Sequence, residues 1–418
     1  MRLYPLLLCA CGGGVGTVDV GLTTAPGSHV LDAVETLRLT ITNPHQVTTA
    51  QKTASGGFDI VIDQPADGAL GALIVEGLDA SGATVAVGQS PPFPFGGIDA
   101  KVLIYMAAPN SVGLAPGTLT PARTGLAVGV LSYGALFAGG TDASGASNQV
   151  AIYNAFDHTL TGGLALPSPR SNLALGIGAN NIAFMFGGTD ASGNPTGTAL
   201  AFNTNAQPNG SYTDFGDKSG FARASQLAVP IGNDHFLITG MPAAELNGLD
   251  GSMTARTEVA SLPAAGASVV GSDGVTTALF AGDAGIVRYR NGAFDTLDPT
   301  PRTGATVVAL PANKLAVVCG GPTLQIDAAT GAIAMFGAHS ETGCAAAATS
   351  RDLVIASGSA VEIDDATTLA PVATATLSVP RTGAAAVALP NDQVMIVGGT
   401  DGSGAPVDAI ELFTPAAP

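Results

Sequence analysis

The sequence has no tryptophan and is poor in aromatic and charged residues: 5% of its 418 residues are aromatic and 11% are charged. Lysine and arginine are fewer than aspartate and glutamate, and the formal net charge is −17. An acidic surface repels the phosphates of nucleic acids and the head groups of anionic lipids. No apolar run reaches the length of about 18 residues that a transmembrane helix needs. We therefore expect no nucleic-acid partner, and contact with a membrane only through a lipid anchor.

The common catalytic motifs are also missing. No Gly-x-Ser-x-Gly elbow supports a hydrolase triad, and no His-Glu-x-x-His or Cys-x-x-Cys pair supports a zinc site. A phosphate-binding loop, an EF-hand loop and a complete sialidase Asp box are absent as well. The histidines of the C-terminal region, His158, His235 and His339, lie far apart along the chain. We assign no catalytic residue, no metal ligand and no cofactor.

The N-terminus has the features of an export signal. It reads "MRLYPLLLCACGGG", with one arginine and a short apolar run before a cysteine. Leu8-Cys9-Ala10-Cys11 resembles a bacterial lipobox, which implies a lipoprotein signal peptide at 1–10, lipidation of Cys11 and a tether at 11–16. Gly12 after Cys11 resembles outer-membrane sorting, so we expect an outer-membrane lipoprotein of the bacterial cell envelope. The alternative is an ordinary cleaved secretion signal.

One heptapeptide occurs three times. "GGTDASG" stands at 139–145 and at 187–193, and "GGTDGSG" stands at 398–404. Each copy follows a short apolar run that ends in glycine, and four further runs end at Gly240, Gly282, Gly321 and Gly358. The seven glycines that end these runs are 37 to 52 residues apart along the chain. Repeats of about 40 to 50 residues with four short strands each are typical of propeller blades.

A second repeated motif, in which proline and arginine are followed by small apolar residues, precedes the apolar runs. Examples are "PARTGLAVGVL" from Pro121 and "PRTGATVVALP" from Pro301. The order of Pro-x-Arg, a small apolar strand, and an apolar strand ending in Gly-Gly resembles kelch repeats. "QIDAATGAI" at 325–333 resembles the kelch Asp-x-x-Thr-Gly turn before the last strand of a blade. The kelch tryptophan is missing. The resemblance implies an all-β, seven-bladed kelch-like β-propeller at 107–418, with blades that begin near Arg123, Arg170, Arg223, Gly266, Arg302, Thr342 and Arg381.

Some kelch proteins of seven blades are copper radical oxidases, whose site needs two tyrosines, two histidines and a cysteine cross-linked to a tyrosine. Tyr133, Tyr153, Tyr212 and Tyr289 show no matching arrangement in this sequence. The stretch 242–259 is long for its repeat, so we consider an insertion there.

Residues 17–106 follow a different pattern. Short alternating segments such as "VETLRLTIT", "GALIVEGLDASG" and "AKVLIYM" are separated by turn residues. They predict a small antiparallel β-sandwich of immunoglobulin-like shape, without the Cys-Trp-Cys core of true immunoglobulin domains. A linker follows at 107–113.

Two long-range contacts follow from the winding of a propeller. The last repeat lacks an outermost strand, so we expect 111–120 to pair beside 407–413 and to close the ring. Cys319 ends the second strand of one repeat, and Cys344 begins the first strand of the next. Both ends lie on the same face, and export permits disulfides, so we predict a Cys319–Cys344 bridge. The alternative is two buried free thiols.

The repeated polar residues should share one face of the propeller. They are Arg123, Arg170, Arg223, Arg302, Arg381, Asp142, Asp190 and Asp401. One interpretation is a ligand-binding rim at the mouth of the central channel. The other, which we prefer, is structural, because binding sites in repeat proteins usually lie where the repeats differ. We expect an envelope-anchored binding or scaffold protein that recognises a protein or a glycan. The alternative is a carbohydrate-active hydrolase or oxidase on the propeller face.

Overall fold

The computed structural model describes residues 4–5, 18–53, 57–58, 69–95, 100–224, 227–339 and 343–417. Within these residues the fold is all-β, apart from two short 3-10 turns, η1 (Ala179–Asn181) and η2 (Ser219–Phe221). No helix in this part of the chain has the length and apolar character needed to cross a membrane. Cys11, the tether and most of the predicted signal peptide lie outside the described residues.

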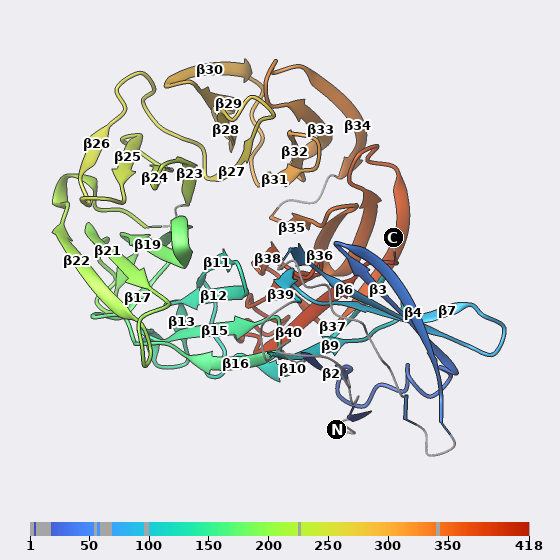
Figure 1. Ribbon diagram of the computed structural model, residues 1–418. Coiled ribbons are helices and arrows are strands. Elements are labelled where there is room, and N and C mark those ends of the chain that lie inside the picture. The colour runs from blue at the N-terminus through green and yellow to red at the C-terminus, as the bar shows by residue number, and fades with distance from the viewer. Residues whose placement is uncertain are drawn as a thin grey trace.

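From residue 127 onward, the short strands β13 (Thr141–Asp142), β14 (Gly145–Ala146), β17 (Arg170–Ser171) and β20 (Thr189–Asp190) form two two-stranded sheets. The other strands form larger antiparallel sheets, in which they pair in the order in which they follow one another along the chain (Figure 1). We call each sheet a blade and name it after its innermost strand. The β11 blade holds β11 (Ala127–Leu131), β12 (Gly134–Ala138), β15 (Val150–Asn154) and β16 (Thr159–Gly162). The β18 blade holds β18 (Ala174–Ile177), β19 (Ile182–Phe186), β21 (Thr198–Asn203) and β22 (Ser211–Asp217). The β23 blade holds β23 (Ala228–Gly232), β24 (His235–Ile238), β25 (Ala244–Asn247) and β26 (Met253–Ala255).

The remaining blades follow the same order. The β27 blade holds β27 (Ala265–Val270), β28 (Thr276–Gly282), β29 (Gly285–Arg290) and β30 (Ala293–Asp298). The β31 blade holds β31 (Thr306–Leu310), β32 (Lys314–Val318), β33 (Gly321–Asp327) and β34 (Ile333–His339). The β35 blade holds β35 (Ala345–Ala348), β36 (Asp352–Asp365) and β37 (Pro371–Arg381). The β38 blade holds β38 (Ala385–Ala388), β39 (Val394–Val397), β40 (Ala409–Thr414) and β10 (Ser111–Thr118).

The innermost strands contact one another in a closed ring. Contacts run from β11 to β18, β23, β27, β31, β35 and β38, and from β38 back to β11. Figure 1 shows the same circular order, with the fourth strands at the outer rim. The apolar side chains of the second and third strands pack between adjacent blades, as Phe184 and Phe236 do between the β18 and β23 blades. This arrangement is that of a β-propeller.

The predicted closure is confirmed. β10 pairs antiparallel with β40, with Ser111 opposite Thr414 and Leu114 opposite Glu411. A buried ion pair joins β37 of the β35 blade to this blade: Arg381 Nη2 lies 2.6 Å from Glu411 Oε1, and neither side chain is exposed. The N-terminal end of the propeller thus supplies the edge strand that the C-terminal end lacks.

The stretch 242–259 is not an insertion. It contains β25 and β26, the third and fourth strands of the β23 blade. The turn between them, Gly248 to Ser252, is held by backbone bonds such as Gly251 N to Asn247 O at 2.8 Å.

Residues 18–105 form a separate β module. One sheet has the order β4 (His45–Gln51), β3 (Thr36–Thr42), β6 (Leu73–Leu78) and β7 (Thr84–Gln89). A second joins β1 (Tyr4–Pro5), β2 (Val18–Thr23) and β9 (Ala100–Tyr105), and β5 (Leu70–Gly71) pairs with β8 (Phe93–Pro94). Alternate residues such as Leu37, Leu39 and Ile41 fill the core between the sheets. Phe156 from the β11 blade packs against this core, and its carbonyl accepts a bond from Leu103 N at 2.7 Å.

Candidate binding site

The repeated arginines lie inside the propeller. Arg123, Arg170, Arg223, Arg302 and Arg381 are between 0% and 8% exposed. In each of them Nη1 donates to a backbone carbonyl of the blade that follows it along the chain: Gly139 and Gln149, Gly187, Thr239, Pro322, and Ala409. Burial lowers the pKa of Arg123, Arg170, Arg223 and Arg381. These bonds fit the structural interpretation, because the guanidinium groups are buried and bind backbone carbonyls.

A glycine pair follows the second strand in the β11, β18, β31 and β38 blades, and in the β11 and β18 blades its backbone bonds to the arginine of the next repeat. Gly139 and Gly140 have φ of 62° and 100°, a region that L-residues with a side chain rarely adopt. A Cβ on Gly139 would lie 2.3 Å from the Arg170 carbonyl oxygen of the next blade. That oxygen instead accepts a bond from Gly140 N at 3.0 Å, and Gly188 N bonds to Arg223 O at 2.9 Å in the same way. Hydrogen bonds from the glycine pair of one repeat to the arginine of the next therefore join successive blades.

The repeated aspartates form turns. Asp142 Oδ1 accepts bonds from Ser144 N at 2.8 Å and Ser144 Oγ at 2.5 Å, and Asp401 accepts the equivalent bonds from Ser403. The serine side-chain bond is the largest cause that lowers the pKa of Asp142 and Asp401. Asp190 accepts from Ser192 N and Asn194 N.

The N-terminal module contains the same turn. Asp79, in the hairpin between β6 and β7, bonds to Ser81 N at 2.8 Å and to Ser81 Oγ at 2.7 Å. Because one turn serves both parts of the chain, the contacts of these aspartates are explained by local backbone geometry. Their carboxylates remain partly exposed on the hairpins that they shape.

The connections between second and third strands are unequal around the ring. We call the face that carries them the mouth face. Long hairpins at 139–149, 187–197 and 398–408 belong to the β11, β18 and β38 blades, which are neighbours. Short turns at 239–243, 283–284 and 319–320 belong to the β23, β27 and β31 blades. Long hairpins therefore project from one side of the mouth face, and only short turns lie on the other side, which we call the low side.

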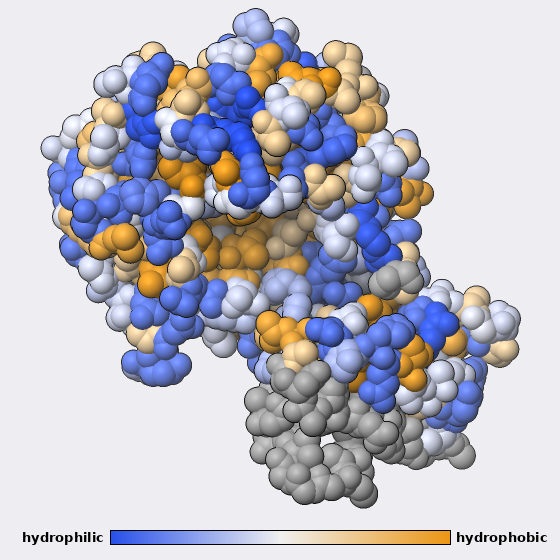
Figure 2. Space-filling model, turned by 45° about the horizontal axis from the view of Figure 1, so that its top comes forward, coloured by the Kyte–Doolittle hydropathy of each residue, from blue (hydrophilic) through white to orange (hydrophobic). Residues whose placement is uncertain are grey.

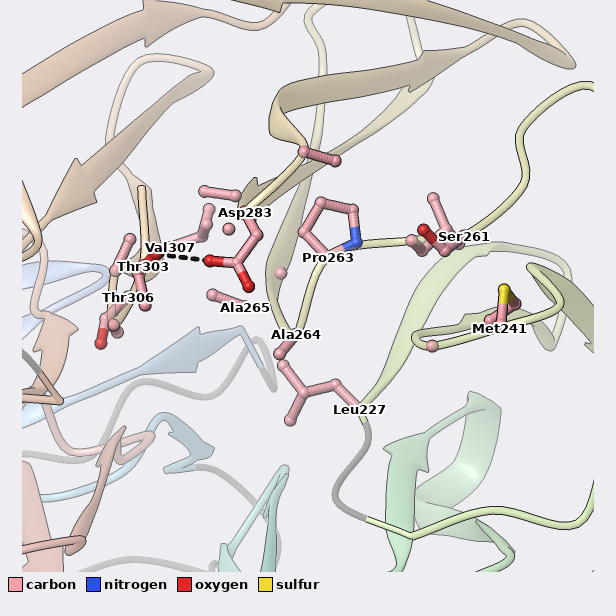
Figure 3. Close-up of a pocket in the computed structure, with 18 residues that line it drawn as sticks. Leu227, Met241, Ser261, Pro263, Ala264, Ala265, Asp283, Thr303, Thr306 and Val307 are labelled. Atoms are coloured by element: carbon pink, nitrogen blue, oxygen red, sulfur yellow. Dashed lines mark hydrogen bonds between the residues drawn. The ribbon is translucent and has the colours of Figure 1, made fainter. Parts of the chain in front are cut away.

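A pocket of about 650 Å³ lies on the low side. It is lined by the short turns of the β23 and β27 blades and by the segments that enter β27 and β31. Figure 3 shows Met241 and Ser261 on one side of it, Asp283 and Thr303 on the other, and Ala264 between them. Leu227 and Met241 are 40% and 76% exposed. Figure 2 shows from one face that the centre of the ring is hollowed and that its walls are hydrophobic.

A hydrogen bond connects the disulfide to the pocket lining. Cys319 and Cys344 are joined, with their Cα atoms 6.3 Å apart, within the range usual for disulfides. They lie just after β32 and just before β35, and so connect the β31 and β35 blades. Thr306, which lines the pocket, donates its hydroxyl to the Cys344 carbonyl at 2.8 Å. The bridge is thus one residue away from the pocket lining.

The chemistry of the lining favours binding. Its one carboxylate, Asp283, accepts a bond from the Thr303 hydroxyl. The other side chains are small, aliphatic or hydroxyl-bearing, and no aromatic residue is among them. Nowhere in the described parts of the chain do three or more His, Cys, Asp or Glu side chains gather as metal ligands would.

The histidines occupy separate structural positions. His158 is buried, and its Nδ1 lies 2.6 Å from the Tyr153 hydroxyl. His235 lies 2.7 Å from Glu245 Oε1. The side chain of His339 falls outside the described atoms. Neither described histidine faces the pocket.

Comparison with known proteins identifies the fold. No protein-family model matches the chain, and no curated protein matches it. Among solved structures, a fungal alcohol oxidase of the AA5 family in complex with copper superposes with a TM-score of 0.53 at 10% identity, covering 72% of this chain and 74% of that one. The structure of YjhT superposes with a TM-score of 0.46 at 12% identity, covering 71% of this chain and 95% of that one. At this identity the likeness to the oxidase shows the fold alone, a propeller with kelch-like blades.

The copper of that oxidase has no fitting ligand set here. The cysteine of a copper radical site must be free to cross-link to a tyrosine, and both described propeller cysteines are in the disulfide. His158 lies against two buried tyrosines, Tyr105 and Tyr153, and no second histidine lies beside it among the interactions described. We therefore derive no oxidase chemistry for this chain.

Proposed function

We propose that this chain is an envelope-anchored binding protein that recognises a protein partner through the pocket on its mouth face. In this proposal Cys11 carries the lipid, residues 17–106 are an immunoglobulin-like sandwich, and the propeller has seven blades. The closed ring of contacts among β11, β18, β23, β27, β31, β35 and β38 supports the blade count. The Cys319–Cys344 bridge supports an exported protein, since disulfides persist in oxidising compartments.

The observation that carries the binding proposal is the unequal mouth face. In repeat proteins the residues that hold the fold recur, and binding residues lie where the repeats differ. The arginines, glycine pairs and aspartates recur from repeat to repeat, and their hydrogen bonds go to other groups of the propeller itself. The pocket lies where the Gly-Thr-Asp-x-Ser-Gly hairpin is absent, and it exposes the non-repeated side chains Leu227 and Met241.

The lining favours a protein over a glycan. Concave sites are mostly apolar with a few placed polar groups, and this one offers aliphatic side chains, three hydroxyl-bearing residues and a single carboxylate. It has no aromatic ring on which a sugar could stack. The enzymatic alternative needs a pair of catalytic carboxylates, and Asp283 has no acidic neighbour in the pocket.

Capture from envelope extracts tests the proposal. Purified wild-type chain should retain a partner that Ala264→Arg loses, because Ala264 is exposed inside the pocket and an arginine would fill it. Ala293→Arg is the matched control, since Ala293 is exposed at the start of the outer strand β30. Equal capture by all three proteins would show that the pocket is not the site. Release of sugar or hydrogen peroxide from glycans by the wild type would favour the enzymatic alternative.

A further inference from the structure

A second pocket, of about 550 Å³, lies where the N-terminal module meets the β11 blade, and we call it the seam pocket. Thr23 and Leu103 of the module form part of its lining. The rest comes from the end of β10, the start of β15, the turn after β15 and the strand β16. It shares no residue with the pocket on the mouth face, so a site here is independent of the proposed function.

Arg123 lines the seam pocket. Its Nη1 donates to the carbonyls of Gly139 and Gln149, each at 2.7 Å. Its Nε and Nη2 are buried, and neither has a hydrogen-bond partner within the part of the chain that the structure describes. A buried charged group that has lost water and gained no acceptor is costly. The fold thus leaves two donor nitrogens of this guanidinium without an acceptor.

Arg123 differs in this respect from the arginines of the other repeats. In each of those, a second nitrogen besides Nη1 has a hydrogen-bond or ion-pair partner. The partners are Ser168 for Arg170, Phe221 for Arg223, Asp298 for Arg302 and Glu411 for Arg381, at 2.8, 3.0, 3.5 and 2.6 Å. Binding residues of repeat proteins lie where the repeats differ. The arginine that departs from the pattern lines a pocket, so its free nitrogens point to a ligand there.

We propose that the seam pocket binds a small hydroxylated monocarboxylate, whose two carboxylate oxygens accept hydrogen bonds from Nε and Nη2 of Arg123. These two nitrogens form one edge of the planar guanidinium, and such an edge matches a carboxylate in a bidentate manner. A dianion such as sulfate fits less well, because the chain has a net charge of −17 and the lining contains the carboxylate of Asp157.

The rest of the lining favours a ligand with hydroxyl groups. Thr118 and Thr120, close to Arg123 in the chain, are exposed and line the pocket. A threonine hydroxyl both donates and accepts, as a ligand hydroxyl does. Asp157 accepts bonds from Thr159 N and Oγ1 at 3.0 and 2.6 Å, so its carboxylate is engaged in its own turn. The lining has no phenyl, phenol or indole ring, which favours an aliphatic acid over an aromatic one.

The burial of Arg123 limits the affinity. The residue is 0% exposed, so a carboxylate reaches its free nitrogens only by displacing neighbouring side chains of the lining. Part of the binding free energy is then spent on this rearrangement. We therefore expect a Kd on the order of 0.1 to 1 mM for a ligand of this size.

Isothermal titration calorimetry of the purified full chain tests the site, with sodium gluconate as the probe at constant ionic strength. Gluconate should bind at one site, whereas neutral sorbitol and dianionic sulfate should not saturate. Arg123→Lys should raise the Kd for gluconate about tenfold or more, because an ammonium group lacks the planar pair of donors. Arg170→Lys is the matched control: it makes the same change in the next repeat and should leave the Kd unchanged.

A second variant leaves the arginine in place. Gly162 is exposed in the lining, and a Cβ there would meet no atom within 4 Å, so Gly162→Phe should occupy the pocket and abolish gluconate binding. Gly402→Phe is its control, because a Cβ at Gly402 also meets nothing and the equivalent hairpin positions hold Ala143 and Ala191.

The outcomes separate the proposal from a purely structural arginine. Loss of gluconate binding in Gly162→Phe, with binding kept in Gly402→Phe, supports the site even if Arg123→Lys does not fold. A wild type that shows no saturable gluconate binding overturns the proposal. So does gluconate binding that survives Gly162→Phe, or that survives Arg123→Lys in a folded protein. Sorbitol or sulfate that binds as tightly as gluconate would contradict recognition of a monocarboxylate.

Discussion

His158 should make the protein lose stability as the pH falls from about 6.5 to about 4. It lies in the turn between β15 and β16, where the β11 blade meets the N-terminal module, and it is 3% exposed. Its ring centroid lies 5.7 Å from that of Tyr105 in β9. Burial lowers the pKa of His158 to about 4.

The sign and size of the effect follow from the two pKa values. An ordinary histidine in the unfolded chain has a pKa near 6.5, so the unfolded state binds the proton more tightly than the folded state. The stability is fully present above about pH 6.5 and is lost as the pH falls, until the folded state also accepts the proton near pH 4. At about 1.4 kcal/mol for each pH unit, the total loss is about 3 kcal/mol, of which about 2.5 kcal/mol is lost by about pH 4.5.

Urea unfolding at about pH 7.5 and about pH 4.5 measures this loss in the wild type and in His158→Asn. Asparagine keeps an acceptor for the Tyr153 hydroxyl, and it tolerates the φ of 56° at this position. The wild type should lose about 2.5 kcal/mol more than the variant between the two pH values. His45→Asn, at an exposed histidine, should keep the wild-type loss. An equal loss in wild type and His158→Asn would refute the reasoning.

Three further predictions concern the closure, the disulfide and the anchor. Glu411→Gln should cost about 3 kcal/mol in urea unfolding, because it leaves the Arg381 charge buried without its partner. Replacing Cys319 and Cys344 together by alanine should cost about 3 kcal/mol through loss of loop closure, and alkylation followed by mass measurement of the oxidised wild type should find neither thiol free. Cys11→Ser should abolish acyl labelling and release soluble protein, and a Cys9→Ser variant that did so instead would contradict the lipobox interpretation.

The sequence predicts the strand order of the propeller well because the fold is built from repeats. Once one repeat is divided into strands, the others follow, and the missing outer strand must come from the segment before the first repeat. The pairing of β10 with β40 confirms this reasoning. The positions of Cys319 and Cys344 could be placed on one face for the same reason. Where the repeat decays, as at 242–259, a sequence without Gly-Gly or Pro-Arg marks gives no basis for assigning β25 and β26.

The repetition of the arginines favoured a structural role, but their depth of burial could not be predicted from one sequence. Arginine is mostly exposed in proteins, so an arginine at the start of a strand suggests a surface residue. Its place here depends on the folded blade: Gly139 and Gly140 turn with positive φ, and the Gly139 carbonyl accepts a bond from Arg123, which enters the same blade. The recurrence of the arginine beside the glycine pair was the available sign that the two act together.

The pocket was missed because its residues are distant in sequence and have no motif. Leu227, Met241, Ala264, Asp283 and Thr303 come from segments that enter or leave five different strands, and only the ring brings them together. One signal was nevertheless present. The hairpin motif is absent from the β23, β27 and β31 blades, while the strands on either side of each connection persist. A blade that keeps its strands and loses a loop lowers one side of the face. In this propeller the candidate site therefore lies at blades that lack the Gly-Thr-Asp-x-Ser-Gly hairpin, and not at the blades that have it.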